Sequence, residues 1–424
     1  MRVRYLLTAL TCLAIALADQ VRAGNWPQFR GAAGSATASD SKIPIRWSAT
    51  ENIVWKADLP GRGSSSPVTW GDHVFVTAYT GFGTSKTDVD DKSKLRLHMI
   101  CLDRSSGRTL WDQSIAASGH TQYFSKRIQG HGYATSTPVT DGEAVYGFFG
   151  VSGVVAYDLK GNLIWQTSVG TKTAGFGSAA SPIVFENLLI VNASIESSSV
   201  YGFDKKTGKP VWKIEEINRA WTTPCVADAP GGSKELIINQ KDTIYGFDPE
   251  TGNQLWTCEG IHDYVVPVPI SHDGVVYCLG GRQNKCIAVK LGGRGDVTQS
   301  HKLWEVNIGA NVTSPIYYQG HLYWASDKAI ANCLDAKSGA AVYRERLQTR
   351  ARIYASMVRA GDSLFVTTRD QGVVVLSAKP DYQELAVNVI ETDDNLLNAS
   401  PAVSGDQLLL RSDSHLYCIG ETGE

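Results

Sequence analysis

Residues 181–212 read SPIVFENLLIVNASIESSSVYGFDKKTGKPVW, and the chain repeats the pattern of these residues many times. The stretch opens with a small residue and a proline before an apolar run, and it closes with an apolar residue followed by an aromatic one. The pattern recurs roughly every 41 to 48 residues through most of the chain. A period of this length indicates a repeat architecture, in which one unit cannot bury its own apolar face and must stack on its neighbours.

The pattern has eight copies. Seven keep the proline: Ser66-Pro67-Val68, Thr137-Pro138-Val139, Ser181-Pro182-Ile183, Thr223-Pro224-Cys225, Val266-Pro267-Val268, Ser314-Pro315-Ile316 and Ser400-Pro401-Ala402. The eighth, Ala355-Ser356-Met357, has lost it. The closing pairs are Leu110-Trp111, Ile164-Trp165, Val211-Trp212, Leu255-Trp256, Leu303-Trp304 and Val342-Tyr343. Because one repeat runs through the chain, we predict a single domain over 24–424.

Each unit contains four short runs rich in β-branched and aromatic residues. In the second unit these runs are Thr137–Thr140, Ala144–Phe149, Val154–Asp158 and Leu163–Thr167. Glycine and aspartate turns separate them, which is typical of strands joined by hairpins. Helical periodicity is absent after the first 23 residues. Each unit is therefore predicted to be a four-stranded antiparallel sheet.

The turn before the closing aromatic is the most regular part of the repeat. It has an aspartate, two variable residues, a serine or threonine and a glycine, at Asp103–Gly107, Asp204–Gly208, Asp248–Gly252 and Asp335–Gly339. The aspartate side chain can accept hydrogen bonds from the backbone of the turn, and glycine tolerates a positive φ. One carboxylate per turn cannot supply the oxygen ligands that calcium needs, so we interpret these acids as structural.

Eight four-stranded sheets predict an all-β fold, an eight-bladed β-propeller. The segment Asn52–Lys56 has the pattern of a closing strand, whereas no such strand follows the last copy, Ala402–Ile419. We therefore expect the N-terminal strand to complete the C-terminal blade and close the ring. Closure removes the open sheet edges on which aggregation begins.

The first 23 residues are typical of a secretory signal peptide. Arg2 and Arg4 precede the apolar run Leu6–Ala18, and Val21–Ala23 fits a cleavage site. This run is too short to span a bilayer comfortably, and no later stretch qualifies. We expect an exported protein that begins near Gly24 and is periplasmic or extracellular.

The charge of the chain excludes some classes of partner. The formal net charge is −2, and it becomes −4 without the three arginines and one aspartate of the signal segment. No basic stripe indicates nucleic-acid binding, and no polybasic cluster indicates an anionic membrane surface. The composition, 43% hydrophobic and 19% charged, is that of an ordinary globular protein.

Seven of the eight cysteines follow the signal segment, and an odd number cannot pair fully within one chain. Cys101, Cys333 and Cys418 occupy repeat positions where other units have aromatic residues, which favours small buried side chains. Cys278 and Cys286 flank a glycine-rich turn. They either form a disulfide across a hairpin or remain buried thiols, depending on the strand register.

The repeated turn and the opening that precedes each unit resemble the PQQ-like repeat of quinoprotein alcohol dehydrogenase-type propellers. The same repeat builds the outer-membrane assembly scaffold BamB, and the resemblance covers Trp55–Gly420. The leader Asn25–Gly31, with Trp47 and Gly63–Pro67, is similar to secreted propellers of planctomycete-type bacteria.

The resemblance implies two classes of function. Quinoprotein dehydrogenases hold PQQ beneath adjacent cysteines and bind calcium with a glutamate and an asparagine beside an aspartate base. This chain has no adjacent cysteines, and none of those positions can be matched in it. We therefore expect no cofactor, no metal and no catalytic residues, with a PQQ- and Ca²⁺-dependent oxidoreductase as the alternative. A polysaccharide-degrading or polysaccharide-sensing enzyme is a third class that the residues leave open.

Segments leading into the innermost strands of a propeller gather around one mouth of its channel, the default place for a ligand. The expected rim residues are Arg62, His131, Tyr133, Phe176, Arg219, Trp221, His262, Asp263, Tyr264, Asn311, Arg352, Tyr354, Asn395 and Asn398. Arginines with aromatic platforms suit carboxylate, phosphate or sulfate groups and flat or sugar rings. The alternative is that these side chains satisfy one another and trapped water. The two histidines are interpreted as hydrogen-bonding rim residues rather than acid–base groups or metal ligands.

The first unit has two irregular loops, Thr80–Lys94 and Ala116–Gly130, and long loops on a repeat scaffold tend to hold binding residues. The sequence thus predicts a monomeric, non-catalytic scaffold. It would bind a protein, a polysaccharide or a small molecule at the propeller face that carries these loops.

Overall fold

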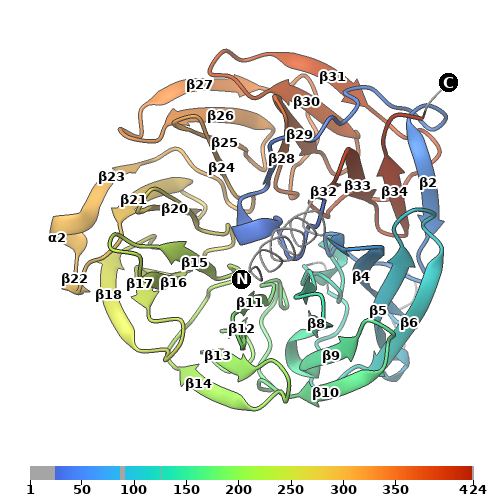
Figure 1. Cartoon of the computed structure of the whole chain (residues 1–424), viewed down its shortest axis with the longest axis horizontal. Coiled ribbons are helices and arrows are strands. Elements are labelled where there is room, and N and C mark those ends of the chain that lie inside the picture. The colour runs from blue at the N-terminus through green and yellow to red at the C-terminus, as the bar shows by residue number, and fades with distance from the viewer. Residues whose placement is uncertain (1–23, 86–90, 126, 423–424) are drawn as a thin grey trace, which may run out of the picture.

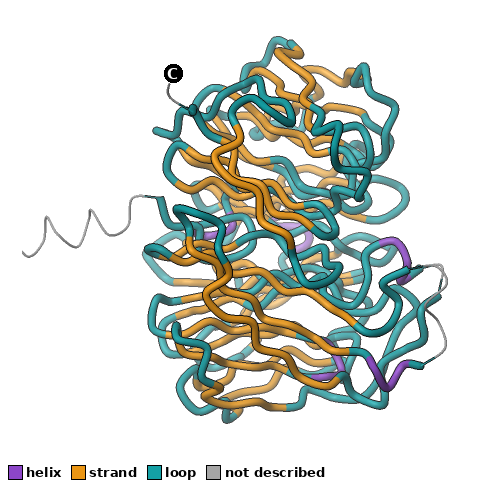
Figure 2. Tube along the Cα trace, turned by 90° about the vertical axis from the view of Figure 1, so that its right-hand side faces the viewer, coloured by secondary structure: helices purple, strands orange, loops and turns teal. Residues whose placement is uncertain are grey.

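The computed structural model describes residues 24–85, 91–125 and 127–422, so the predicted signal peptide lies outside the described residues. Eight sheets circle one axis, and each turns its shortest strand toward the centre (Figure 1). This confirms the predicted eight-bladed propeller of four-stranded antiparallel blades. Figure 2 shows the ring from the side, with the strands between two faces covered by loops.

The first four blades follow the chain order, each from its innermost to its outermost strand. Blade 1 holds β3 (Val68–Trp70), β4 (His73–Thr80), β5 (Arg96–Asp103) and β6 (Thr109–Ala116). Blade 2 holds β7 (Val139–Thr140), β8 (Ala144–Phe148), β9 (Val154–Asp158) and β10 (Leu163–Thr167). Blade 3 holds β11 (Ile183–Phe185), β12 (Leu188–Ala193), β13 (Ser199–Asp204) and β14 (Pro210–Ile214). Blade 4 holds β15 (Cys225–Asp228), β16 (Lys234–Gln240), β17 (Thr243–Phe247) and β18 (Gln254–Glu259).

The other four blades continue in the same way. Blade 5 holds β19 (Ile270–His272), β20 (Val275–Gly280), β21 (Lys285–Lys290) and β23 (Lys302–Val306). Blade 6 holds β24 (Ile316–Tyr318), β25 (His321–Ala325), β26 (Ile330–Asp335) and β27 (Ala341–Arg346). Blade 7 holds β28 (Val358–Ala360), β29 (Ser363–Thr367), β30 (Val373–Ser377) and β31 (Glu384–Asn388). Blade 8 holds β32 (Ala402–Ser404), β33 (Gln407–Arg411), β34 (His415–Ile419) and the N-terminal β2 (Ile53–Asp58).

A few elements lie outside this plan. The short β1 (Thr37–Ala38) pairs in parallel with β28, and β22 (Gly295–Asp296) pairs in parallel with the outer strand β18. The helical segments among the described residues are single turns: η1 (Ala32–Gly34), η2 (Lys92–Lys94), η3 (Ile128–Gly130), η4 (Gly150–Ser152) and α2 (Thr298–His301). None of the helices in the described ranges has the length and apolar character needed to cross a membrane.

The N-terminal strand closes the ring as predicted. β2 pairs antiparallel with β34, with Trp55 opposite Cys418. Two arginines then join blade 8 to blade 1. The Arg62 Nε donates to the Asp413 Oδ2 over 3.1 Å. The fully buried Arg411 donates to the Ser65 carbonyl over 3.0 Å. The first and last parts of the chain therefore form one continuous sheet and one packed junction.

Tryptophans at the closing position join successive blades from outside. The indole N–H of Trp111 donates to the Leu159 carbonyl over 2.9 Å, in the turn that follows β9 of the next blade. We call this contact the outer latch. It recurs from Trp55 to Arg104, from Trp165 to Lys205, from Trp212 to Pro249 and from Trp304 to Ala336, at 2.9–3.2 Å. Trp256 is an exception, because its indole donates to the Glu235 carboxylate within its own blade.

The turn glycine is part of the outer latch. Gly208 has a φ of 69°, and a Cβ placed on it would lie 2.6 Å from the Trp165 ring of the preceding blade. The aspartate of the same turn accepts a 2.8 Å hydrogen bond from the Thr207 N–H. The repeated motif therefore shapes a turn that lies flat against the neighbouring indole, which confirms that these aspartates are structural.

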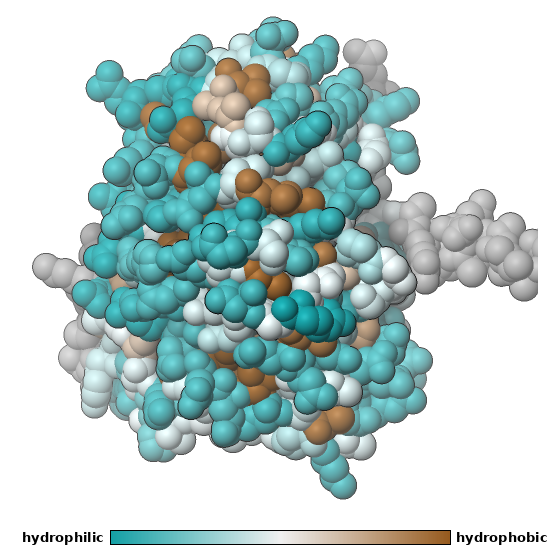
Figure 3. All heavy atoms as spheres, turned by 90° about the vertical axis from the view of Figure 1, so that its left-hand side faces the viewer, coloured by the Kyte–Doolittle hydropathy of each residue, from teal (hydrophilic) through white to brown (hydrophobic). Residues whose placement is uncertain are grey.

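The outer wall carries exposed aliphatic residues just before the latch position, such as Leu303 and Val342. Charged and polar side chains separate them, so the apolar patches in Figure 3 are interrupted.

A second set of contacts joins the blades around the channel. In six blades, the N–H of the residue before the proline, or of Ser356 where the proline is lost, donates to the side-chain hydroxyl at the same position of the next blade. We call this set the inner belt. Its six hydrogen bonds measure 2.9–3.0 Å and run Ser66 to Thr137, Thr137 to Ser181, Ser181 to Thr223, Val268 to Ser314, Ser314 to Ser356 and Ser356 to Ser400.

The inner belt corrects the sequence alignment of blade 5. We assigned Val266-Pro267-Val268 to the opening, but the belt residue is Val268, followed by Pro269 and Ile270. The two prolines, two residues apart, made both registers plausible in the sequence. Because valine has no hydroxyl, the Thr223 N–H finds no acceptor among the described residues.

The cysteine pair also differs from the disulfide alternative. In the β20–β21 ladder Cys278 lies opposite Ile287, and Cys286 lies opposite Leu279. The two thiols therefore point to opposite faces of the blade, because side chains alternate along a strand. All seven cysteines in the described residues are buried and free.

Replacing Gly208 should test the outer latch. Alanine at 208 must adopt a left-handed backbone and displace Trp165, so we expect a loss of about 2–5 kcal/mol in the free energy of unfolding. Gly320 is a matched control, because its φ is 79° but its Cβ position is open. Gly320→Ala should cost about 1–2 kcal/mol. Chemical denaturation measures both, and equal losses would contradict the latch.

Val268→Thr should add one of the two bonds that the inner belt lacks among the described residues. The new hydroxyl would accept from the buried Thr223 N–H, as threonine already does at 137 and 223, and should add about 1 kcal/mol to the free energy of unfolding. Val266→Thr makes the same substitution at a position outside the inner belt and is the matched control. A thermal melt that shows no gain for Val268→Thr over Val266→Thr would refute this role.

Candidate functional site

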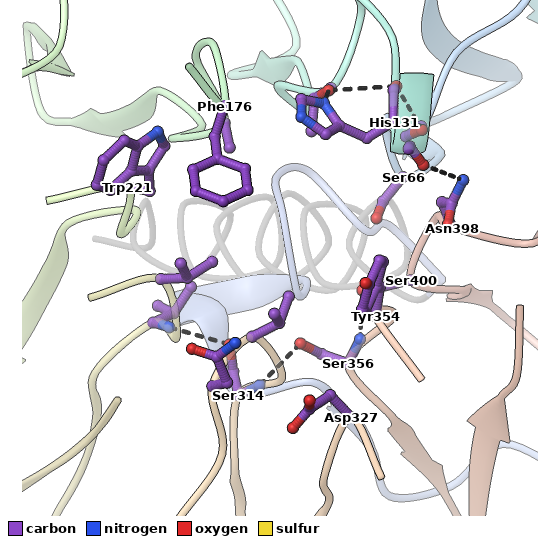
Figure 4. Close-up of a pocket in the computed structure, with 18 of the residues that line it drawn as sticks. Ser66, His131, Phe176, Trp221, Ser314, Asp327, Tyr354, Ser356, Asn398 and Ser400 are labelled. Atoms are coloured by element: carbon purple, nitrogen blue, oxygen red, sulfur yellow. Dashed lines mark hydrogen bonds between the residues drawn. The ribbon is translucent and has the colours of Figure 1, made fainter. Parts of the chain in front are cut away.

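The centre of the ring holds a cavity of about 760 Å³, within the range typical of ligand sites. Most of its walls come from the segments that lead into the innermost strands, as the sequence predicted, and all eight blades contribute (Figure 4). This placement follows from the inner belt, which holds those segments at the same level around the axis.

The N-terminal leader forms the floor of the cavity. Trp26 pairs with Thr69 of blade 1, and the Thr140 N–H of blade 2 donates to the Pro27 carbonyl over 2.9 Å. The leader then crosses to blade 7, where β1 pairs with β28. Phe29 lines the cavity from this side. The channel is therefore blocked at one end, and a ligand would enter from the other.

Arg30 anchors the leader beneath the floor. It is 1% exposed, and its guanidinium donates to the carbonyls of Gly34, Ser314 and Pro315. Burial lowers the pKa of Arg30 to about 9, which still leaves it charged at neutral pH. No carboxylate among the described residues pairs with it, so the floor has a positive charge just below its surface.

Seven hydroxyls of the inner belt line the inner part of the cavity. They are those of Ser66, Thr137, Ser181, Thr223, Ser314, Ser356 and Ser400. Six of them accept a backbone N–H of a neighbouring blade. A hydroxyl that accepts one hydrogen bond still has a proton to donate and a second lone pair. The inner part of the cavity is thus rich in small hydrogen-bonding groups.

One wall of the cavity is aromatic. Phe176, of the segment before β11, lies 6.2 Å from the Trp221 ring in an edge-on arrangement, and 6.2 Å from the Tyr264 ring. Trp221 is fixed by its indole N–H, which donates to the Gly177 carbonyl over 2.7 Å. Phe176 remains 41% exposed and points into the cavity (Figure 4). The Arg127 guanidinium lies 4.9 Å from the Phe176 ring.

The opposite wall is basic. Arg350 and Arg352 precede β28 and are exposed, and Lys328 comes from the hairpin between β25 and β26. Arg369 lies 4.7 Å above the Tyr354 ring and donates to the Asn398 Oδ1 over 2.9 Å.

Among the described residues, none of the five lining cations, Arg127 included, forms an ion pair, and Asp327 is the only lining carboxylate. A chain of net negative charge therefore surrounds a positive cavity, which would attract anions.

His131 lies where blades 1 and 2 meet the cavity. Its Nδ1 is 2.7 Å from the Thr135 hydroxyl, and its carbonyl accepts from the Ser64 hydroxyl. Burial lowers the pKa of His131 to about 4, so the imidazole is neutral near pH 7. It offers hydrogen bonds, not charge, to whatever occupies the cavity.

The structure brings eight of the fourteen expected rim residues together. His131, Phe176, Trp221, Tyr264, Asn311, Arg352, Tyr354 and Asn398 line the cavity. Three others lie outside it because they bind neighbouring groups. Arg62 pairs with Asp413, Asp263 with Arg282 at 2.9 Å, and Asn395 with Ser414 at 2.9 Å.

The remaining three expected residues also lie off the cavity. The Tyr133 hydroxyl donates to the Gln122 carbonyl behind the wall, and its ring packs 5.4 Å from Tyr79. His262 is exposed, with its Nδ1 3.0 Å from Asp242. Arg219 is exposed at a φ of 53° and does not line the cavity.

Asp327, Lys328 and Arg369 were not predicted, because only the segments that enter the innermost strands were expected to form the rim. These residues lie in the hairpins between the second and third strands of blades 6 and 7. Strands alternate in direction, so both kinds of loop open on the same face. That rule would have added these hairpins to the candidates.

Comparison with known proteins agrees with this architecture. The family described as outer membrane protein assembly factor BamB, a PQQ-like repeat family, matches at residues 35–194, 96–220, 196–304 and 293–419. The chain belongs to this family. No curated protein matches it in sequence.

Solved structures similar to this BamB-family propeller share its fold at low identity. BamB from Moraxella catarrhalis is 13% identical with a TM-score of 0.59, over 86% of this chain and 98% of that one. Quinohemoprotein alcohol dehydrogenase from Comamonas testosteroni is 11% identical with a TM-score of 0.63, over 97% and 83%. The computationally designed Ika8 protein is 11% identical with a TM-score of 0.58, over 87% and 100%. At these identities the likeness shows the fold alone.

The BamB-family propeller also has a buried acid behind its aromatic wall. Glu196 is 1% exposed and accepts a hydrogen bond from the Ser178 hydroxyl, two residues beyond Phe176. Burial raises the pKa of Glu196 from 4.5 to about 7. The folded protein therefore holds this proton more tightly than the unfolded chain does.

This shift predicts how stability depends on pH. The contribution of protonated Glu196 to the free energy of unfolding is fully present below pH 4.5 and is lost as the pH rises through about 7. The loss should amount to about 3 kcal/mol. Glu196→Gln keeps a neutral side chain at every pH, so it should raise the unfolding free energy at pH 8 but not at pH 4. Denaturation at both pH values measures this, and an equal effect at both would contradict the assignment.

Proposed function

We propose that this protein is a non-catalytic scaffold, periplasmic or extracellular, that captures an anionic protein segment or polymer in its central cavity. One observation carries the proposal: five cations without ion-pair partners line a cavity that is closed at its inner end. The signal-like N-terminus and the name of the matching family support the location.

Physical chemistry favours anions in such a cavity. A concave site with walls of low dielectric constant concentrates the field of its charges and raises the local concentration of an oppositely charged ligand. Arginine presents a planar fork of donors that matches carboxylate, phosphate and sulfate oxygens. Arg350 and Arg352 are exposed and have no side-chain partner among the described residues, so a ligand need not displace one.

The same side chains suit recognition better than reaction. Arginine stays protonated at physiological pH and does not transfer protons. His131 is neutral and bonded to Thr135, and its lowered pKa places it far from the range useful for acid–base work near pH 7. The lining groups therefore hold and orient a ligand.

The quinoprotein alternative fits the site only in part. PQQ carries carboxylates that the arginines could bind, and the aromatic wall could contact its ring system. Calcium, in contrast, takes six to eight oxygen ligands, often several carboxylates, and Asp327 is the only carboxylate among the described lining residues. A melt at saturating PQQ and Ca²⁺ separates the two functions, since a ligand of the native state must raise the midpoint.

The double variant Arg350→Ser/Arg352→Ser tests the proposed function. Binding of poly-L-glutamate and of dextran sulfate, measured by surface plasmon resonance at 50 and 150 mM salt, should weaken by about 10- to 100-fold. The variant Arg108→Ser/Arg344→Ser removes the same charge from exposed turn and outer-strand positions and is the matched control.

The control variant should bind as the unmodified protein does, and uncharged dextran should bind to none of the three proteins. If neither polyanion binds, or if both double variants lose the same affinity, capture in the cavity is wrong.

A further inference from the structure

We infer that the cavity takes the acidic terminal unit of a saccharide chain, a sugar ring that bears a carboxylate or a sulfate. The inference rests on the proposed function and names the class of anion. Three features of the cavity carry it: its closed inner end, its many hydrogen-bonding groups, and the placement of an aromatic wall opposite a basic one.

The closed end requires that a polymer enter end-first. The leader blocks the channel with Phe29 at its surface and Arg30 anchored below, so a chain cannot thread through the ring. A cavity of about 760 Å³ suits a small ligand or the last units of a chain. The rest of the polymer would leave through the open mouth.

The hydrogen-bonding groups of the cavity match a ligand rich in hydroxyls. Asn311 lines the cavity, and its Oδ1 is buried without a hydrogen-bond partner. A carbonyl oxygen only accepts, so a ligand donor that reaches this atom would satisfy it. The belt hydroxyls beside it can donate and accept, as sugar hydroxyls do.

The seven belt hydroxyls that line the cavity favour a saccharide over an acidic peptide. Ionised aspartate and glutamate side chains only accept hydrogen bonds, so an acidic peptide has no donors except its backbone N–H groups. An unmet buried acceptor carries a cost in binding. A sugar hydroxyl can donate to Asn311 while other oxygens of the same ring accept from the belt.

The two walls fix how the sugar would lie. Phe176 points into the cavity, and Arg127, Trp221 and Tyr264 hold its ring in place. Such a ring offers an apolar surface to the C–H face of a pyranose. Arg350, Arg352 and Lys328 lie on the opposite wall, where they can bind an acidic substituent of that sugar.

Isothermal titration calorimetry with short oligosaccharides tests the inference. The probes are uronate trimers and sulfated trimers of gluco, galacto and manno configuration, their neutral counterparts, and hexaglutamate. At least one acidic trimer should bind about tenfold or more tightly than both its neutral counterpart and hexaglutamate. Binding of a uronate trimer or of a sulfated trimer would support the inference. The trimer that binds identifies the acidic group.

Two variants check the contacts. Phe176→Ala and Asn311→Leu should each weaken binding of the acidic trimer by about tenfold. Tyr123→Ala is the matched control, because Tyr123 is 69% exposed and does not line the cavity. Saturation-transfer NMR on the unmodified protein gives a readout that needs no variant, since the sugar ring protons should receive the strongest transfer.

The outcomes separate this inference from the proposed function. If poly-L-glutamate or dextran sulfate binds through Arg350 and Arg352 but no acidic trimer exceeds hexaglutamate, the saccharide class is wrong and the scaffold function stands. If neutral trimers bind as tightly as acidic ones, the claim that the cavity recognises an acidic substituent is wrong. If no anionic probe binds at all, both fail.

Discussion

The structure depends on one hydrogen bond repeated around the axis, from a backbone N–H of one blade, in five of six cases just before a proline, to the hydroxyl of the next blade. These six bonds of the inner belt hold the innermost segments at one level. Proline fixes φ and has no N–H to offer the sheet, so the chain turns into the blade at that point. Trp221, Tyr354 and Asn398 each lie two residues before a belt position. The contact that aligns the blades therefore also aligns the side chains around the cavity.

The N-terminal leader gives this ring its particular chemistry. A bare channel lined with polar residues would be open to water at both ends, but the leader crosses it and leaves a cavity with one mouth. Arg30 is charged beneath that floor, and the lining cations surround the space above it. Because charges in a concave site reinforce one another, the cavity is positive although the chain as a whole is negative.

Membership of the BamB family explains the ring of blades. It does not explain the chemistry of the cavity, which depends on the residues that line it. The outer latch and the inner belt are contacts of the repeat, and they build the ring whatever occupies the centre. A designed protein, a BamB and a quinohemoprotein dehydrogenase share this fold with the chain at 11–13% identity. A fold shared so widely specifies no ligand. The unpaired arginines, the exposed Phe176 and the unsatisfied Asn311 supply the functional argument.

Local patterns were sufficient to predict the blades, their four strands, the structural turns and the closing strand, because each follows from turn chemistry and periodicity within one repeat. Strand registers and side-chain partners were not predictable from these patterns. The register of β20 and β21 put Cys278 and Cys286 on opposite faces, and the belt moved the blade 5 opening to Val268. Arg62 and Arg352 look alike in sequence, yet one pairs with Asp413 and the other lines the cavity. Which charge is neutralised depends on neighbours hundreds of residues away, and only the folded ring brings those neighbours together.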